Sequence, residues 1–185
     1  PASIDASDVS VTGVTVSSDD CEPGWIFVAI PGLTQHGIRF AHAAIEAGAA
    51  VILTDEEGRV QAHERGLGAP VVQVADPRGV VPALCANVYS SPATRLTTMA
   101  ITGTNGKTTT SYLMRAAIAS RFPHASLCGT VETHVGPISF EAVRTTAEAP
   151  VVARFLAATE QYECGAGVIE LSAHALSLHR VDGIV

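Results

Sequence analysis

Residues 101–109 read Ile-Thr-Gly-Thr-Asn-Gly-Lys-Thr-Thr, and they indicate the fold of the chain more clearly than any other segment. An apolar strand, expected over residues 96–102, runs into a glycine turn, and a helix is expected from about Lys107 to Ser120. This context is typical of a loop that cradles phosphate, because glycines let backbone N–H groups point inward at the start of a helix. Lys107 would add a point charge for the β- and γ-phosphates, and the Thr108 hydroxyl is suited to ligate Mg²⁺.

The loop is shorter than the common pattern G-x-x-x-x-G-K-[ST]. Counted back from Gly106, the first glycine of that pattern would fall at position 101, where this chain has Ile101. What remains is the shortened loop Gly-Thr-Asn-Gly-Lys-Thr. A chance glycine turn before a helix is the alternative, but the Lys-Thr pair in register and the strand before it favour a phosphate site.

Strands alternate with helices on both sides of this loop. Before it, the sequence predicts strands over residues 9–16, 25–30, 49–53 and 69–74, and helices over residues 40–47, 56–66 and 77–89. After it, the sequence predicts a strand over 125–128, an irregular hairpin or loop over 131–144, a helix over 148–162, a strand over 167–171 and the start of another strand at 184–185. The alternation predicts an α/β fold with a mostly parallel sheet, and the linker Ser90-Ser91-Pro92 predicts two domains, residues 1–91 and 92–185.

Composition excludes several classes of protein. The 185 residues are 47% apolar and 16% charged, which disfavours long disorder. The net charge of −7 argues against broad binding of nucleic acid or anionic membranes, although a small phosphate site can use backbone N–H groups and one lysine. We expect neither a membrane span nor secretion, because no apolar run reaches about 18 residues and no basic, then apolar, leader pattern is present.

The cysteines and the chain ends add two further expectations. The four cysteines, at positions 21, 85, 128 and 164, form no CxxC pair, so they are expected to be scattered buried thiols of a cytoplasmic protein rather than zinc ligands. The chain begins with Pro1 and ends on the apolar pair Ile184-Val185, and we therefore expect it to be part of a larger protein.

The loop and several other segments resemble the Mur ligases, which are ATP-dependent amide-forming enzymes of peptidoglycan precursor synthesis. Those segments are Pro-Gly-Trp-Ile-Phe-Val-Ala-Ile-Pro-Gly at 23–32, Ala-Ala-Ile-Glu-Ala-Gly-Ala-Ala-Val at 43–51, residues 93–109, Thr-Thr-Ala-Glu-Ala-Pro at 145–150, Glu-Leu-Ser-Ala-His-Ala-Leu at 170–176 and His-Arg-Val-Asp-Gly at 179–183. The resemblance covers essentially the whole chain. Within the family, the last of these segments is specific to the ligase that adds the third amino acid to UDP-MurNAc-L-Ala-D-Glu.

The resemblance implies a domain organisation. Residues 1–91 would form the N-terminal domain that binds the UDP-substrate, and residues 92–185 the first part of a central ATPase domain. The rest of that domain, with a carbamylated lysine and further metal ligands, and a C-terminal domain would lie beyond Val185. The family further implies a monomer, and the sequence leaves open whether lysine or meso-diaminopimelate is the third amino acid.

The resemblance also assigns the residues that hold the cofactors, ATP and Mg²⁺. The ATP loop comprises Gly103, Thr104, Asn105, Gly106, Lys107, Thr108 and Thr109. Glu170 ends a predicted strand, a place that suits Mg²⁺ ligation near a phosphate loop, and in the family this glutamate binds the metal together with Thr108. Lys107 and Glu170 are therefore the expected catalytic residues, and a surface glutamate is the alternative for Glu170.

Seven residues match family positions that contact the UDP-substrate. In the second half these are Thr145, Thr146, Ser172 and Arg180; Ala147 and Ala173 depart from the family's usual Pro and Ser. His174 and His179 are assigned structural roles, because no acidic partner for either is apparent in the sequence.

In the first half the corresponding residues are Ser18, Thr34 and Gln35. Ser18 lies in a family motif Asp-Ser-Arg that reads Ser-Ser-Asp here. The exchange of Arg for Asp19 reverses the charge, so this side chain would not contact a phosphate.

The family reaction has two steps. The D-Glu carboxylate of the substrate attacks the γ-phosphate of ATP to give an acyl phosphate and ADP, and the incoming amine then displaces phosphate to form the amide. Charge neutralisation between two approaching anions is the main catalytic demand. Two alternatives stay open at this point: a non-catalytic nucleotide-binding subunit, and a Mur-like ligase for another acidic acceptor.

Overall fold

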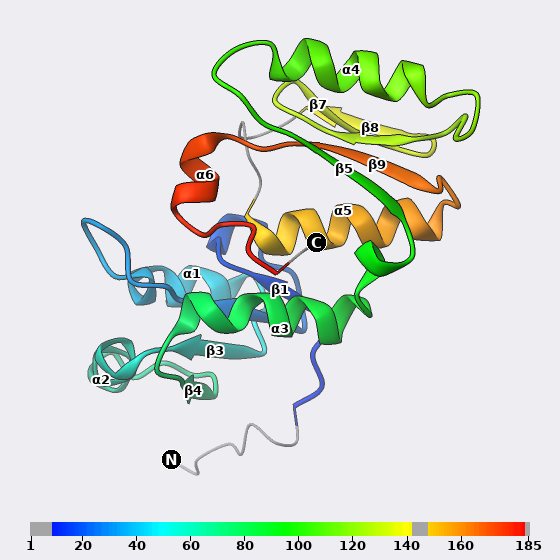
Figure 1. Ribbon diagram of the computed structural model, residues 1–185. Coiled ribbons are helices and arrows are strands. Elements are labelled where there is room, and N and C mark those ends of the chain that lie inside the picture. The colour runs from blue at the N-terminus through cyan, green and yellow to red at the C-terminus, as the bar shows by residue number, and fades with distance from the viewer. Residues whose placement is uncertain (1–8, 142–147, 184–185) are drawn as a thin grey trace. The chain divides into compact units, whose positions relative to one another are not determined.

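The computed structural model describes residues 9–141 and 148–183, and it divides the chain into two compact units, Pro1–Val88 and Tyr89–Val185 (Figure 1). Each unit contains one β-sheet with helices, and the two are described separately. The α/β fold expected from the alternating pattern is confirmed.

The first unit contains a sheet in the order β1-β2-β3-β4, in which every neighbouring pair is parallel. Its strands are β1 (Gly13–Thr15), β2 (Trp25–Val28), β3 (Val51–Thr54) and β4 (Val71–Gln73). Its helices are α1 (Ala41–Glu46), α2 (Glu56–Glu64) and α3 (Pro77–Tyr89), and 3-10 turns occupy Ser18–Asp20 and Gly37–Phe40. Every residue of β2 and β3 is buried, as expected for strands covered on both faces.

The core of this unit is built from small and medium apolar side chains around two aromatic ones. Its buried members are Cys21, Trp25, Phe27, Ala29, Ile38, Ala41, Ala44, Ala49, Ile52 and Ala62. Trp25 packs where its neighbour on β1 has no side chain: a Cβ added at Gly13 would lie 2.4 Å from the Trp25 Cε2 atom. Glycine at this position therefore lets the indole ring lie against the sheet.

The second unit contains a mixed sheet in the order β5-β9-β6-β7-β8. Its strands are β5 (Thr97–Ile101), β6 (Ser126–Cys128), β7 (Glu132–Val135), β8 (Ile138–Glu141) and β9 (Ala166–Glu170). Strands β5, β9 and β6 are parallel, and β7 and β8 continue the sheet as an antiparallel hairpin. Helices α4 (Lys107–Ala117) and α5 (Ala149–Gln161) lie on opposite faces of this sheet (Figure 1), and α6 (Ala173–Ser177) follows β9.

Most expected elements are present, usually one to three residues shorter at an end, and the structure differs from the sequence-based prediction in two places. The segment expected to be an irregular hairpin or loop is a regular hairpin, in which Thr133 pairs with Phe140 and Val135 with Ile138. Helix α6 was not predicted, because it has only five residues and thus too few for a periodic pattern. The strand expected to begin at residue 184 lies outside the described residues.

Two simpler expectations can be compared directly with the structure. The four cysteines are free and buried, as expected. Among residues 9–141 and 148–183, no helix has the length and apolar character needed to cross a bilayer.

Candidate nucleotide-binding site

The candidate site lies at the carboxyl edge of the three parallel strands of the second sheet. Ile101 at the end of β5 is in register with Glu170 at the end of β9, and Cys128 at the end of β6 is in register with Ile169. The loop after β5, the side chain of Glu170 and the segment after β6 therefore meet at one edge. Open α/β sheets characteristically bind ligands at this edge.

The glycine loop joins β5 to α4 through two unusual backbone conformations. Gly103 has φ of +151° and Gly106 has φ of +79°, both in the region that favours glycine. Gly106 is the N-cap of α4 and contributes no side-chain cap, and the first hydrogen bond of the helix runs from Thr110 N to Gly106 O at 2.8 Å. The N–H groups of residues 107–109 thus have no acceptor within the helix, which is the arrangement that binds an anion.

Lys107 begins α4 and folds back over the loop. Its Nζ donates to the carbonyl oxygens of Gly103, at 2.8 Å, and Thr104, at 3.3 Å. The ammonium group therefore lies over the same turn whose N–H groups begin the helix. This places a positive charge beside the N-terminal end of α4, where unpaired N–H groups favour an anion.

The carboxylate of Glu170 is buried, with 2% of the residue exposed, and it accepts hydrogen bonds from three hydroxyl groups. Thr108 Oγ1 lies 3.0 Å and Thr130 Oγ1 2.9 Å from Glu170 Oε2. Ser111 Oγ lies 3.1 Å from Oε1 and also 2.7 Å from the carbonyl oxygen of Thr108. Glu170 is therefore not a surface glutamate, and the structure brings it together with Thr108.

The chemistry of these groups fits Mg²⁺. In octahedral coordination with oxygens about 2.1 Å from the ion, two adjacent ligands are about 3 Å apart, which is the separation of Thr108 Oγ1 and Glu170 Oε2. Within the described ranges Glu170 forms no ion pair, so a bound cation would neutralise a buried charge. The described residues contain no group of three His, Cys, Asp or Glu side chains that could hold a metal, so Thr108 and Glu170 would supply only part of a cation's ligands.

Gly129, which follows β6, leaves room for this carboxylate. A Cβ added at Gly129 would lie 2.5 Å from Glu170 Oε1, closer than real Cβ atoms approach a neighbour. We expect Gly129→Ala to displace the carboxylate and to lower kcat about tenfold or more at saturating ATP, since a small misplacement of a reacting group is costly. A steady-state assay of the full-length protein, with Gly68→Ala as the control at an uncrowded glycine, measures this. Equal kcat values for both variants would contradict it.

Among the described residues, Glu132 and Cys128 lie near the candidate site but form no hydrogen bond with Glu170. Tyr112 Oη and Ser139 Oγ donate to the two oxygens of Glu132, at 2.9 and 3.0 Å, and these bonds lower the pKa of that carboxyl. They join α4 to the β7–β8 hairpin.

Burial raises the pKa of the Cys128 thiol to about 11, so the thiol stays protonated at neutral pH and is no nucleophile.

The predicted substrate residues of the first unit lie in turns and loops, where Ser18 is partly buried and Thr34 and Gln35 are exposed. Ser18 begins a 3-10 turn, and its hydroxyl lies 3.4 Å from Asp19 Oδ1. Thr34 and Gln35 lie in the exposed loop between β2 and the 3-10 turn at Gly37, and Gln35 Oε1 accepts from Arg39 Nη1 at 2.6 Å.

In the second unit, two of the four predicted substrate residues can be described. Thr145 and Thr146 lie outside the described residues. Ser172 is the N-cap of α6, where its oxygen accepts from Ala175 N at 3.1 Å. Arg180 Nε lies 3.2 Å from Glu148 Oε1, an ion pair without hydrogen-bond geometry, and Arg180 O accepts from Ala149 N. Both residues therefore flank helix termini.

One histidine differs from the sequence-based interpretation. His179 Nδ1 lies 2.7 Å from Asp182 Oδ2, so this ring does have an acidic partner three residues away. Both side chains are more than half exposed, and such a pair contributes little to stability.

Sequence reasoning did not find Ser111 and Thr130, although both contact Glu170. A signal was available for each. Ser111 is three residues after Thr108 and thus on the same face of α4. Thr130 follows a strand of the parallel group, as Glu170 ends another, so the same edge rule applies to both.

Comparisons with known proteins agree with this geometry. Residues 10–95 match the family model described as Mur ligase family, catalytic domain, and residues 101–185 match the Mur ligase middle domain. A UDP-N-acetylmuramoyl-L-alanyl-D-glutamate–2,6-diaminopimelate ligase from Streptomyces avermitilis is 40% identical over 178 residues, 96% of this chain. A UDP-N-acetylmuramyl-tripeptide synthetase from Leifsonia xyli is also 40% identical, over 180 residues and 97% of this chain.

The solved structures are consistent with the sequence matches. A structure of a UDP-N-acetylmuramoyl-L-alanyl-D-glutamate–2,6-diaminopimelate ligase has a TM-score of 0.70 and 25% identity, and covers 94% of this chain and 34% of that one. A MurF ligase from Thermotoga maritima in complex with ADP, at 18% identity with a TM-score of 0.52 over 90% of this chain and 33% of that one, shares the fold.

The chain spans about a third of the length of these relatives, namely 35% of both curated proteins. Two family models cover nearly all of it, one for each half. The phosphate loop, the buried glutamate and these matches agree with one another, and the chain belongs to the Mur ligase family.

Proposed function

We propose that the full-length protein is an ATP-dependent ligase that adds meso-diaminopimelate to UDP-MurNAc-L-Ala-D-Glu. The observation that carries the proposal is the 3.0 Å separation of Thr108 Oγ1 and Glu170 Oε2 at the start of α4, where a phosphate and a divalent cation fit together. The choice of diaminopimelate rests on the names of the relatives from Streptomyces avermitilis, Streptomyces coelicolor and Corynebacterium glutamicum.

The residues of this chain would neutralise charge while a carboxylate approaches the γ-phosphate. The N–H groups at the start of α4 would hold the β-phosphate, and Lys107 would leave its two carbonyl partners to contact the β- and γ-phosphates. Mg²⁺, when bound to Thr108 and Glu170, would supply a further positive charge at the phosphate oxygens. These contacts strengthen as charge moves toward ADP, so they favour the transition state.

The two halves of the chain are assigned different ligands. Residues 1–91 would bind the UDP part of the substrate through Ser18, Thr34 and Gln35, and residues 92–185 would bind ATP. Ser172 and Arg180, with Thr145 and Thr146, would contact the muramoyl-peptide. Ser172 and Arg180 both lie outside the helices, in the segments before and after α6, and such connecting segments commonly hold ligand-binding side chains.

A single assay tests the proposed function. The full-length protein is incubated with UDP-MurNAc-L-Ala-D-Glu, Mg-ATP and either meso-diaminopimelate or lysine, and products are weighed by mass spectrometry while ADP is quantified. We expect a product heavier by one diaminopimelate residue, one ADP per product, and loss of turnover when EDTA removes Mg²⁺. ADP formation only with a different acidic acceptor would contradict the assigned substrate, and ATP binding without any turnover would contradict the assigned reaction.

A further inference from the structure

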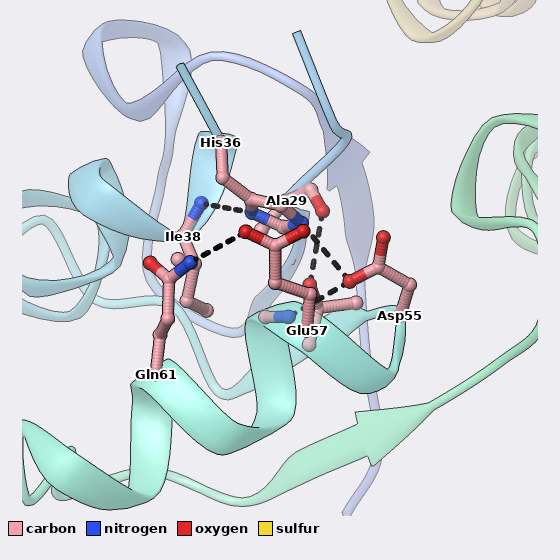
Figure 2. A network of polar contacts seen from close by, with 8 residues as sticks. Ala29, His36, Ile38, Asp55, Glu57 and Gln61 are labelled. Atoms are coloured by element: carbon pink, nitrogen blue, oxygen red, sulfur yellow. Dashed lines mark hydrogen bonds and ion pairs between the residues drawn. The ribbon is translucent and has the colours of Figure 1, made fainter.

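The first unit contains a buried polar pair far in sequence from the nucleotide loop (Figure 2). His36 has 6% of its side chain exposed, and its Nε2 lies 2.9 Å from Asp55 Oδ1. The other ring nitrogen, Nδ1, accepts from the backbone N–H of Ile38 at 3.1 Å. Both nitrogens are therefore satisfied inside the protein, which is the condition for burying an imidazole at low cost.

These contacts determine the tautomer of His36. The N–H of Ile38 can only donate, so Nδ1 carries no proton and the ring proton is on Nε2. That proton is donated to Asp55, whose carboxylate can only accept when ionised. His36 therefore accepts one hydrogen bond, from Ile38, and donates one, to Asp55. An asparagine at this position can reproduce the first bond but is too short to form the second.

Asp55 connects this histidine to helix α2. It follows β3 and is the N-cap of α2, because Oδ1 also accepts from Gly58 N at 2.8 Å. The ring fits here because position 58 has no side chain: a Cβ at Gly58 would lie 2.7 Å from His36 Cε1 and 2.0 Å from Thr54 Oγ1. The helix start, the end of β3 and the imidazole therefore pack as one unit.

His36 also closes the base of an exposed loop. Pro31 and His36 form an antiparallel bridge, Gly32 N donates to Gln35 O at 3.1 Å, and Gly37 N donates to Ile30 O at 3.0 Å. The tip between them is solvent-exposed, and Leu33 is 95% exposed. These bonds join the loop to itself and to Ile30, which follows β2, whereas the His36–Asp55 contact joins it to the N-cap of α2.

We propose that the His36–Asp55 pair positions loop 31–36, so that Thr34 and Gln35 at its tip are held ready to contact the UDP part of the substrate. His36 is then a positioning residue that acts through the loop and touches no ligand itself. The proposal rests on the function proposed above, in which this unit binds the UDP-substrate.

The test, in the full-length protein, removes the hydrogen bond from His36 to Asp55 and keeps the one from Ile38 to residue 36. His36→Asn retains an acceptor at the place of Nδ1, and Asn is a favoured N-cap, but its side chain is too short for Asp55. We expect the KM for UDP-MurNAc-L-Ala-D-Glu to rise about tenfold, the effect of losing a buried hydrogen bond to a charged group, while kcat and the KM for ATP stay the same. Equal KM values for the UDP-substrate in wild type and folded variant would overturn the proposal.

Two variants of Asp55 give an independent measurement if His36→Asn does not fold. Asp55→Ser keeps a cap for α2 but does not reach His36, so we expect the same rise in the KM for the UDP-substrate. Asp55→Asn retains an acceptor oxygen for both His36 and Gly58, and we expect this variant to stay within about twofold of wild type. A rise in Asp55→Asn as large as in Asp55→Ser would contradict positioning through this hydrogen bond.

The matched control is on the exposed face of the same helix. Glu57→Ala removes the contact in which Gln61 Nε2 donates to Glu57 Oε1 at 3.0 Å, without touching the loop (Figure 2). It should leave both KM values unchanged. A wild-type protein that forms no product would disprove the proposed function, whereas an active wild type with unchanged His36 and Asp55 variants would disprove only the positioning role.

Discussion

Replacing Glu170 by Gln should lower kcat about 10²- to 10³-fold while leaving the protein at least as stable. The loss follows because a neutral amide ligates Mg²⁺ poorly and no longer offsets its charge beside Thr108. Stability should not fall, because the buried carboxylate forms no ion pair among the described residues. Hydroxyls that face the amide nitrogen can rotate to accept from it, and those that face the amide oxygen can continue to donate.

The measurement combines a steady-state assay over a range of Mg²⁺ concentrations with a thermal unfolding curve. The matched control is Glu132→Gln, a glutamate on the same sheet that also accepts from two hydroxyls but is only partly buried. We expect this control to keep kcat within about twofold of wild type, the range of a surface change. A Glu170→Gln protein with normal turnover at low Mg²⁺ would show that the cation binds elsewhere.

Replacing Lys107 by Ala should lower kcat/KM for ATP about 10²- to 10³-fold and leave binding of the UDP-substrate unchanged. Lys107 is the only lysine among the 185 residues, and the other ten basic side chains are arginines. A compact ammonium group suits this place, since it contacts two loop carbonyls that a planar guanidinium would not fit in the same way. Lys107→Arg should therefore not restore activity.

A chemical measurement can accompany the kinetics. An amine-reactive reagent followed by peptide mass spectrometry reports on Lys107 directly, and Mg-ATP should slow its modification. The matched control is Arg121→Ala, which removes a cation whose guanidinium carbon lies 5.7 Å from the Phe122 ring centroid beyond the other end of α4. An equal loss of activity in that variant would indicate a general effect of net charge rather than a phosphate contact.

The nucleotide loop and Glu170 could be predicted because each marks the end of a strand in a pattern with few alternatives. A glycine turn after an apolar strand, a Lys-Thr pair where a helix should begin and a lone acid at the end of an apolar run are sequence patterns with few alternatives. Ser111 and Thr130 are harder to identify from the sequence, because hydroxyl residues are common in loops and helices. The packing of α4 against β9 brings Ser111 to Glu170, and the pairing of β6 with β9 brings Thr130 to it.

The burial of His36 could not be predicted from the sequence for a different reason. A histidine between glutamine and glycine in a polar loop suggests an exposed side chain, and its only acidic partner among the described residues is 19 positions away. Burial follows from the absence of a side chain at Gly58 and from the cap at Asp55, two features of another element. Helix α6 was missed for a related reason, since a cap such as Ser172 is convincing only when a longer periodic segment follows.

The strand orders of the two sheets imply that the sheets form at different stages of synthesis. In the first sheet each strand lies beside its predecessor in the sequence, so the sheet can grow as successive segments leave the ribosome. In the second sheet β9 lies between β5 and β6, and Thr97 pairs with Ala166 across 69 positions. Such non-local pairing slows folding because a large loop must close first. The nucleotide site is therefore assembled only after Glu170 has been synthesised, when the first unit already has all four of its strands.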